Sequence, residues 1–391
     1  MSRLRARLAA LQDPAASPAD NNDLRGRLAA RGRGRAPRRP DDTELARRLG
    51  ARVLAPGLLL VEESLRPNAR HGDVGLRPTS AALDYFGATA DPGRTLYLDT
   101  ETSGLAGGTG TVAFLVGVAR FRERRLWLRQ WLLSGHGGEA ALLAALTAEL
   151  ADAELLVSFN GRSFDVPLLI TRYALQRQAE PLSRLTPLDL LHLSRRAFSR
   201  HWPDCRLASV EQRLLGVRRD DDLPGSAVPA VWRAWLTRGC SRELPRVLHH
   251  NRWDLLSLAA LPLRLAMAYA RPRRWGADCR AAAKLLLEQG DARAALAHLQ
   301  AQGPWLEAAD TLALADLALR CGEPAVALGA WERLARDDHP TALGKLAGYF
   351  ERRQPDPARA LDYTRRKLAL DPDDTVSRRR EARLLARLER G

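Results

Sequence analysis

The sequence of 391 residues is poor in several features that would have narrowed its class at once. Its four cysteines, Cys205, Cys240, Cys279 and Cys321, have spacings typical of neither a zinc site nor a dense disulfide framework. It has no uncharged apolar run of about 18 residues, and no apolar segment of a secretory signal follows the first arginines. These absences predict a soluble, cytoplasmic protein with free thiols and no membrane partner.

Lysine is scarce as well, since only Lys284, Lys345 and Lys367 are lysines among 61 basic residues. The net charge of +15 is therefore carried almost wholly by arginine, which binds phosphate in a forked geometry and stacks on bases. This charge predicts a nucleic-acid partner. The alternative is that the heavy use of Arg, Ala and Leu reflects a coding bias.

The length predicts two folded units with tails. Residues 1–40 carry ten arginines against three aspartates and have little to bury, so they are predicted to form a disordered basic arm. Such an arm would bind nucleic acid without sequence preference, or serve only as a solubilising tail. We expect residues 41–91 to be an N-terminal attachment, containing an apolar run at 57–61 typical of a strand.

Residues 92–272 alternate strand and helix patterns after an initial meander, which indicates an α/β domain with a mixed sheet. Predicted strands lie at 96–98, 112–121, 125–133 and 155–159, with a hairpin turn at 122–125, and 187–193 is a fifth strand or a short apolar run. Predicted helices lie at 139–150, after an N-cap at Ser163, at 205–215, at 230–237 and around 248–261.

Two carboxylates end the first strand of this domain. Asp99 and Glu101 are two residues apart and therefore point to the same face. Like charges brought together in a partly buried place favour a neutralising cation, and hard oxygen ligands favour Mg²⁺ or Mn²⁺. The alternative for so short a pattern is an acidic turn in solvent. Asp165 and Asp254 provide two further acidic positions later in the domain.

Residues 275–391 are rich in Ala and Leu and repeat a short pattern. Ala-Leu pairs recur at 295–296, 327–328 and 360–361, after Gly-Asp, Gly-Glu and Asp-Pro respectively. This period is close to the ~34 residues of tetratricopeptide repeats. The repeats are degenerate, so a generic array of helical hairpins is the alternative.

Taken together, the motifs resemble the YprB-like family of the DEDD superfamily of 3′–5′ exonucleases. The resemblance rests on Asp-Thr-Glu-Thr-Ser-Gly-Leu at 99–105, Asn-Gly-Arg-Ser-Phe-Asp at 160–165, Arg-Leu-Ala-Ser-Val-Glu at 206–211 with Asp-Asp-Leu-Pro-Gly at 221–225, and His-Asn-Arg-Trp-Asp-Leu-Leu-Ser-Leu at 250–258. It implies a ribonuclease-H-like mixed sheet flanked by helices, followed by an all-α helical-repeat domain.

The resemblance also implies roles for individual residues. Asp99, Glu101, Asp165 and Asp254 would hold two metal ions, Mg²⁺ or Mn²⁺, for an in-line displacement. A general base is expected near the last acid, and two histidines compete for that role. His250 lies four residues before Asp254 and shares its helix face, whereas His249, five before, fits only if the helix starts after it. We favour His250.

The sequence therefore predicts a metal-dependent 3′–5′ exonuclease that hydrolyses single-stranded DNA or RNA ends. The alternative is a catalytically weak or inactive scaffold that binds nucleic acid and recruits a protein partner through the helical repeats. Asp189 is expected to be structural, and Asp220–Asp222 to be a turn in solvent. The choice between DNA and RNA is left open, since it depends on contacts to the 2′-hydroxyl.

Overall fold

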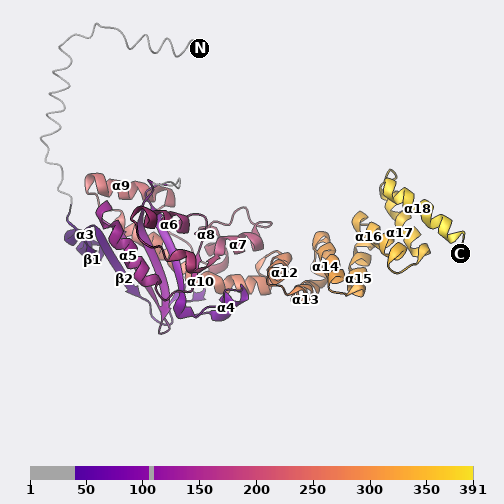
Figure 1. Ribbon diagram of the computed structural model, residues 1–391, viewed down its shortest axis with the longest axis horizontal. Helices are drawn as coiled ribbons and strands as arrows, with labels where there is room; N and C mark the ends of the chain where they lie inside the picture. The colour runs from indigo at the N-terminus through magenta and orange to yellow at the C-terminus, as the bar shows by residue number, and fades with distance from the viewer. Residues whose placement is uncertain (1–39, 105–109, 391) are drawn as a thin grey trace, which may run out of the picture.

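The structure is a computed structural model that describes residues 40–104 and 110–390. The basic arm predicted at 1–40 lies outside these residues except for Pro40. A sheet domain occupies one end of the molecule, and a run of helices extends from it to the C-terminus (Figure 1). None of the helices in the described ranges has the length and apolar composition needed to cross a membrane.

The sheet has seven strands in the order β1-β2-β7-β6-β5-β8-β9. The strands are β1 (Arg52–Ala55), β2 (Leu58–Ser64), β5 (Thr95–Thr102), β6 (Ala113–Arg122), β7 (Arg125–Leu133), β8 (Leu155–Ser158) and β9 (Thr186–Asp189). All neighbours up to β5 are antiparallel, whereas β8 and β9 continue the sheet in parallel. The predicted mixed sheet is confirmed.

The meander that opens the domain also follows the prediction. The turn between β6 and β7 consists of Glu123 and Arg124, both with positive φ, which matches the twist of a tight hairpin. The N-terminal attachment adds more than one strand, because β1 and β2 extend the sheet beyond β7. A small hairpin of β3 (Arg70–His71) and β4 (Val74–Gly75) follows them.

Helices cover both faces of the sheet and form two apolar cores. The helices are α3 (Asp42–Leu49), α4 (Ser80–Tyr85), α5 (Glu139–Leu150), α6 (Asp165–Leu175), α7 (Leu190–Phe198), α8 (Leu207–Val210), α9 (Val228–Arg238), α10 (Leu244–Ala270) and α11 (Pro272–Trp275). Short 3₁₀ turns are η1 (Pro92–Arg94), η2 (His136–Gly138), η3 (Leu182–Arg184) and η5 (Gly225–Ala227). The long helix α10 belongs to both cores, through Leu244 at its start and Leu255 further on.

The start of α6 differs from the prediction. Ser163 is not the N-cap, because Phe164 precedes the helix and no side chain caps it. Instead, the chain turns at Asn160, where φ is 67°. Asp189 at the end of β9 holds this turn by accepting hydrogen bonds from the backbone N–H groups of Asn160 (2.8 Å) and Arg162 (3.2 Å). A carboxylate from a neighbouring strand thus holds the turn before the helix, and Asp165 is the first residue of α6.

The C-terminal helices form successive antiparallel pairs, as the repeat pattern predicts. They are α12 (Cys279–Glu288), α13 (Ala292–Gln302), α14 (Ala308–Arg320), α15 (Pro324–Arg336), α16 (Pro340–Arg352), α17 (Pro357–Leu370) and α18 (Thr375–Leu388), with the turn η6 (Gly303–Trp305). The alanines of the recurring pairs, Ala295, Ala327 and Ala360, are completely buried. Small side chains at these positions allow neighbouring helices to approach closely, which explains the recurrence.

Candidate active site

The end of β5 places two carboxylates on one face of the sheet. Glu101 is 9 % exposed, and Asp99 is partly buried beside it. Asp99 pairs across the sheet with Gly117 of β6. A Cβ atom at position 117 would lie 2.1 Å from Asn251 Oδ1, so the glycine allows α10 to cross the sheet at close range beside these acids.

Helix α10 supplies two polar side chains at this crossing, Asn251 and Asp254. Asn251 is completely buried and donates a hydrogen bond of 2.7 Å from Nδ2 to Asp99 Oδ2. Its Oδ1 accepts a hydrogen bond of 2.8 Å from Gln130 Nε2 on β7. One turn further along the same helix, Asp254 is 9 % exposed. The sheet and α10 together thus fix the positions of Asp99 and Asp254.

The fourth acid comes from the first residue of α6. Thr100 donates a hydrogen bond from its hydroxyl to Asp165 Oδ1, which ties the start of the helix to the end of β5. The position of Asp165 follows from the turn at Asn160, because this turn directs the first residue of α6 towards β5. The structure therefore brings together all four acids singled out from the sequence.

Burial and mutual repulsion perturb the ionisation of this cluster. Burial raises the pKa values of Asp99 and Glu101 well above their usual range, and the charges of Asp254 and Asp165 raise them further. Burial likewise raises the pKa of Asp165 to about 6, although the hydrogen bond from Thr100 opposes the shift. Negative charge is therefore costly here unless a cation is present.

His250 lies among the acids and is oriented by a further carboxylate. Its Nδ1 is 2.8 Å from Asp222 Oδ2. When Nδ1–H is donated to Asp222, the lone pair of Nε2 faces Glu101 Oε1 at 3.7 Å and Asp254 Oδ2 at 3.9 Å. His249 is exposed on α10 and meets the ring of Trp253 edge to face instead. The structure thus places His250, and not His249, next to the acids.

Comparison with known proteins agrees with this architecture. Residues 96–266 match the model of the RNase H superfamily, from β5 to the second half of α10. The chain is also 31 % identical, over 307 residues, to the uncharacterized protein YprB of Bacillus subtilis (strain 168), covering 75 % of this chain and 73 % of that protein. This chain belongs to the YprB family. The strands β1 and β2 and the helices from α12 onward lie outside the region that matches the superfamily model.

The sequence motifs did not predict that this YprB-family site contains a buried arginine, Arg219. The Arg219 guanidinium donates hydrogen bonds to Glu211 (2.6 and 2.7 Å), to Asp222 Oδ2 (3.0 Å) and to Asp254 Oδ1. Glu211 is completely buried in a π-helical turn, η4 (Glu211–Leu215). Such turns occur often at functional sites. Arg219 thus supplies one positive charge to the acidic cluster.

Asp222 corrects the expectation that Asp220–Asp222 is a turn in solvent. Its side chain is 12 % exposed and contacts both Arg219 and His250. Glu211 and Asp222 stand within two of the motifs quoted for the resemblance, at 206–211 and 221–225, but ten residues lie between them. Only the fold shows that they share one arginine. Asp189, by contrast, caps α7 by accepting a hydrogen bond from the N–H of Leu191 (3.0 Å), a contact that fits the structural role expected for it.

The chemistry of the four carboxylates fits hard divalent cations. In the described ranges 40–104 and 110–390, however, no three His, Cys, Asp or Glu side chains are grouped so that they could hold an ion. Three of the four acids are turned towards a protein partner: Asp99 towards Asn251, Asp165 towards Thr100, and Asp254 towards Arg219. Binding of a cation would require these side chains to rotate, and relief of the repulsion between them would favour it.

Proposed function

We propose that this YprB-family protein is a divalent-metal-dependent 3′–5′ exonuclease acting on single-stranded DNA or RNA ends. The observation that carries the proposal is the convergence of four carboxylates, from β5, α6 and α10, with His250 Nε2 beside two of them, Glu101 and Asp254. The RNase H superfamily fold is typical of nucleases and supports nucleic acid as the substrate. The 3′–5′ direction is taken from the family resemblance.

In this proposal the site would hold two metal ions, either Mg²⁺ or Mn²⁺. Their ligands would be Asp99, Glu101, Asp165 and Asp254. Such ions activate water and stabilise the charge that develops on the leaving oxygen. Asn251 keeps Asp99 in place through its hydrogen bond. Arg219 keeps Asp254 in place and reduces the repulsion between the acids.

His250 is proposed as the general base, with Nε2 as the atom that takes a proton from the attacking water. Asp222 accepts the Nδ1–H bond, so it selects the required tautomer and stabilises the imidazolium that results. His249 lacks this arrangement, because its ring packs on Trp253. We therefore propose a catalytic role for His250 alone of the pair.

The test is degradation of single-stranded DNA and RNA labelled at either end, with Mg²⁺, Mn²⁺ or a chelator. The unmodified protein is expected to shorten the strand from its 3′ end only when metal is present. Asp99→Asn is expected to abolish cleavage, by at least ~10³-fold, while the circular-dichroism spectrum is unchanged. Metal-independent cleavage, or full activity of Asp99→Asn, would rule the proposal out.

A second candidate, a binding scaffold without nuclease activity, has one observation in its favour. Arg219 already neutralises Asp254, one of the four acids that a metal would need. On this alternative, the chain binds nucleic acid tightly but cleaves neither DNA nor RNA with either metal. A thermal unfolding midpoint that Mn²⁺ leaves unchanged would also support the scaffold, whereas an increase that is lost in Asp165→Asn would support the enzyme.

A further inference from the structure

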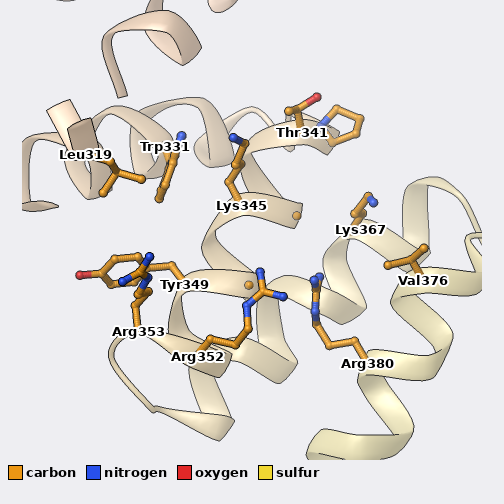
Figure 2. Close-up of a pocket in the computed structure, with 13 residues that line it drawn as sticks. Leu319, Trp331, Thr341, Lys345, Tyr349, Arg352, Arg353, Lys367, Val376 and Arg380 are labelled. Carbon is orange, nitrogen blue, oxygen red and sulfur yellow. The ribbon is translucent and has the colours of Figure 1, made fainter. Parts of the chain in front are cut away.

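The C-terminal helices enclose a groove of about 1040 Å³, away from the sheet domain. Residues of α14, α15, α16, α17 and α18 line it, and the face of α16 forms its floor (Figure 2). Cationic side chains predominate among the polar residues of the lining. They are Lys345, Arg352, Arg353, Lys367 and Arg380.

Two glycines on α16 bring the cationic groups together. Gly344 and Gly348 are one turn apart, and the lack of side chains leaves room above the helix. A Cβ atom at position 348 would lie 3.1 Å from Arg352 Nη2 and 3.6 Å from Arg380 Nη2. At position 344 it would lie 3.6 Å from Lys367 Nζ. The charged ends of Arg352, Lys367 and Arg380 therefore lie close together, over the stretch of α16 that contains the two glycines.

The positive charge of this groove is only partly balanced. Carboxylates pair with three of the cations: Asp316 with Lys345, Asp374 with Lys367, and Glu351 with Arg380. Arg352 and Arg353 are exposed, and within the described part of the chain no carboxylate forms an ion pair with either. Arg380 is 8 % exposed, so its charge is also poorly screened by water. Unbalanced cations that point into one groove attract an anion.

The wider surroundings give the groove the same sign of charge. Residues 340–390 contain thirteen basic and eight acidic residues, whereas residues 275–339 contain six basic and ten acidic ones. Positive charge is thus concentrated at the end of the repeats that is remote from the sheet domain (Figure 1). A polyanion would be drawn to this end rather than spread along the helices.

We propose that this groove binds the phosphate backbone of a single strand of nucleic acid, at a distance from the active site. The inference rests on the proposed function, which makes a nucleic-acid strand the polyanion that the chain handles. Arginine pairs with phosphate in a forked geometry, and the two glycines of α16 let the charged ends of Arg352, Arg380 and Lys367 gather in one place, where a strand can meet them together. Trp331 is 2 % exposed, so its ring is not available for stacking on a base.

The position of the groove predicts a dependence on strand length. Four successive helix contacts separate α12, which packs on the sheet domain, from α16. With helices about 8–10 Å apart, the separation is roughly 40 Å. A stacked strand advances about 3.4 Å per nucleotide, so roughly a dozen nucleotides span the distance from α12 to the groove, and a strand must be longer still to reach the active site beyond α12. Longer strands therefore gain affinity from the groove, and short ones do not.

The test measures binding by fluorescence anisotropy in the Asp99→Asn background, where the strand is not cleaved. The groove variant is Arg352→Gln with Arg353→Gln. The matched control is Arg378→Gln with Arg379→Gln, which removes two exposed charges from α18 outside the groove. Each protein is titrated with a 40-nucleotide and a 6-nucleotide strand over a range of salt concentrations.

The groove variant is expected to bind the 40-nucleotide strand about 5–10-fold more weakly, with a salt slope smaller by roughly 1. Its affinity for the 6-nucleotide strand should equal that of the Asp99→Asn parent. The control variant should bind both strands almost as tightly as the parent. Equal losses for both strands, equal losses in the control, or no loss at all would overturn the proposal. Displacement of the long strand from the groove by a glutamate-rich peptide that binds more tightly would assign the groove to a protein partner instead.

The two proposals can fail separately. If the groove variant loses affinity for long strands but the unmodified protein cleaves nothing, the proposed exonuclease activity is wrong and the proposed binding groove is supported. If cleavage of the 6-nucleotide strand is normal and the groove variant binds long strands as tightly as the parent, only the groove fails. Circular dichroism of the variants excludes loss of folding as the cause of weak binding.

Discussion

At the scale of single residues, the site is a balance between buried negative charges and one buried positive charge. The Arg219 side chain is 11 % exposed, and it contacts Glu211, Asp222 and Asp254 at once. Removing one partner of a buried ion pair leaves an uncompensated charge, which costs far more than losing a surface pair. Arg219 is therefore expected to matter for stability as well as for the geometry of the acids.

Replacement of Arg219 by glutamine should lower the free energy of unfolding by about 3 kcal/mol, because Glu211 would be left buried without a cation. Urea unfolding measures the change. The matched surface variant is Arg246→Gln, whose exposed pair with Glu243 should contribute less than about 1 kcal/mol. Adding Glu211→Gln to Arg219→Gln should recover part of the loss. A cost for Arg219→Gln no larger than that of Arg246→Gln would contradict this account.

At the scale of elements, the site depends on how closely α10 crosses the sheet. The crossing point is Gly117 on β6, where Asn251 fits against the bare backbone and reaches across to Asp99. Any side chain at position 117 would push the helix away from the strand. The distance between Asp99 on β5 and Asp254 on α10 would then change, although neither acid had been touched.

Gly117→Ala is accordingly expected to cost about 1–3 kcal/mol of stability and to reduce the proposed nuclease activity strongly. Thermal unfolding and the cleavage assay report the two effects. Gly329→Ala in α15 is the control, because a Cβ atom there would meet nothing within 4 Å. Alanine in that helix should stabilise the protein by about 0.5–1 kcal/mol. If Gly117→Ala were as well tolerated as Gly329→Ala, the close crossing would not be what positions the acids.

At the scale of the whole molecule, positive charge lies at both ends of the chain. Residues 1–39 hold ten arginines and three aspartates, and the last helices form the second basic region. The proposed active site between them is itself acidic. Charges at the ends can therefore hold a strand that the acids alone would repel.

A chain shortened to residues 40–391 should bind single-stranded nucleic acid more weakly at low salt. Since each phosphate contact contributes about 0.7 to the salt slope on single strands, loss of the arginines should lower that slope by roughly 2 or more. Anisotropy titrations at several salt concentrations measure it. Cleavage at saturating strand concentration should not change, because no residue of the proposed site is removed. An unchanged salt slope would show that the arginines do not contact the strand.

Much of the fold follows from local patterns in the sequence. Apolar runs bounded by turn residues predicted β5 to β8 and the hairpin at Glu123 and Arg124, because strand and turn preferences act over a few residues. The Ala-Leu pairs predicted the helical repeats for a similar reason. The N-cap predicted at Ser163 was wrong because α6 begins only at Asp165, after a turn that is held by Asp189, which is distant in sequence.

The sequence by itself determined which acids are available and, through alternation on β5, that Asp99 and Glu101 share a face. Only the tertiary structure decided how charge is balanced around them. Arg219, Glu211 and Asp222 come together through a π-helical turn and a loop, and Asn251 reaches Asp99 because Gly117 leaves space. Periodicity reports the face on which a residue lies, whereas partners across elements depend on how helices and sheet pack, which no local pattern encodes.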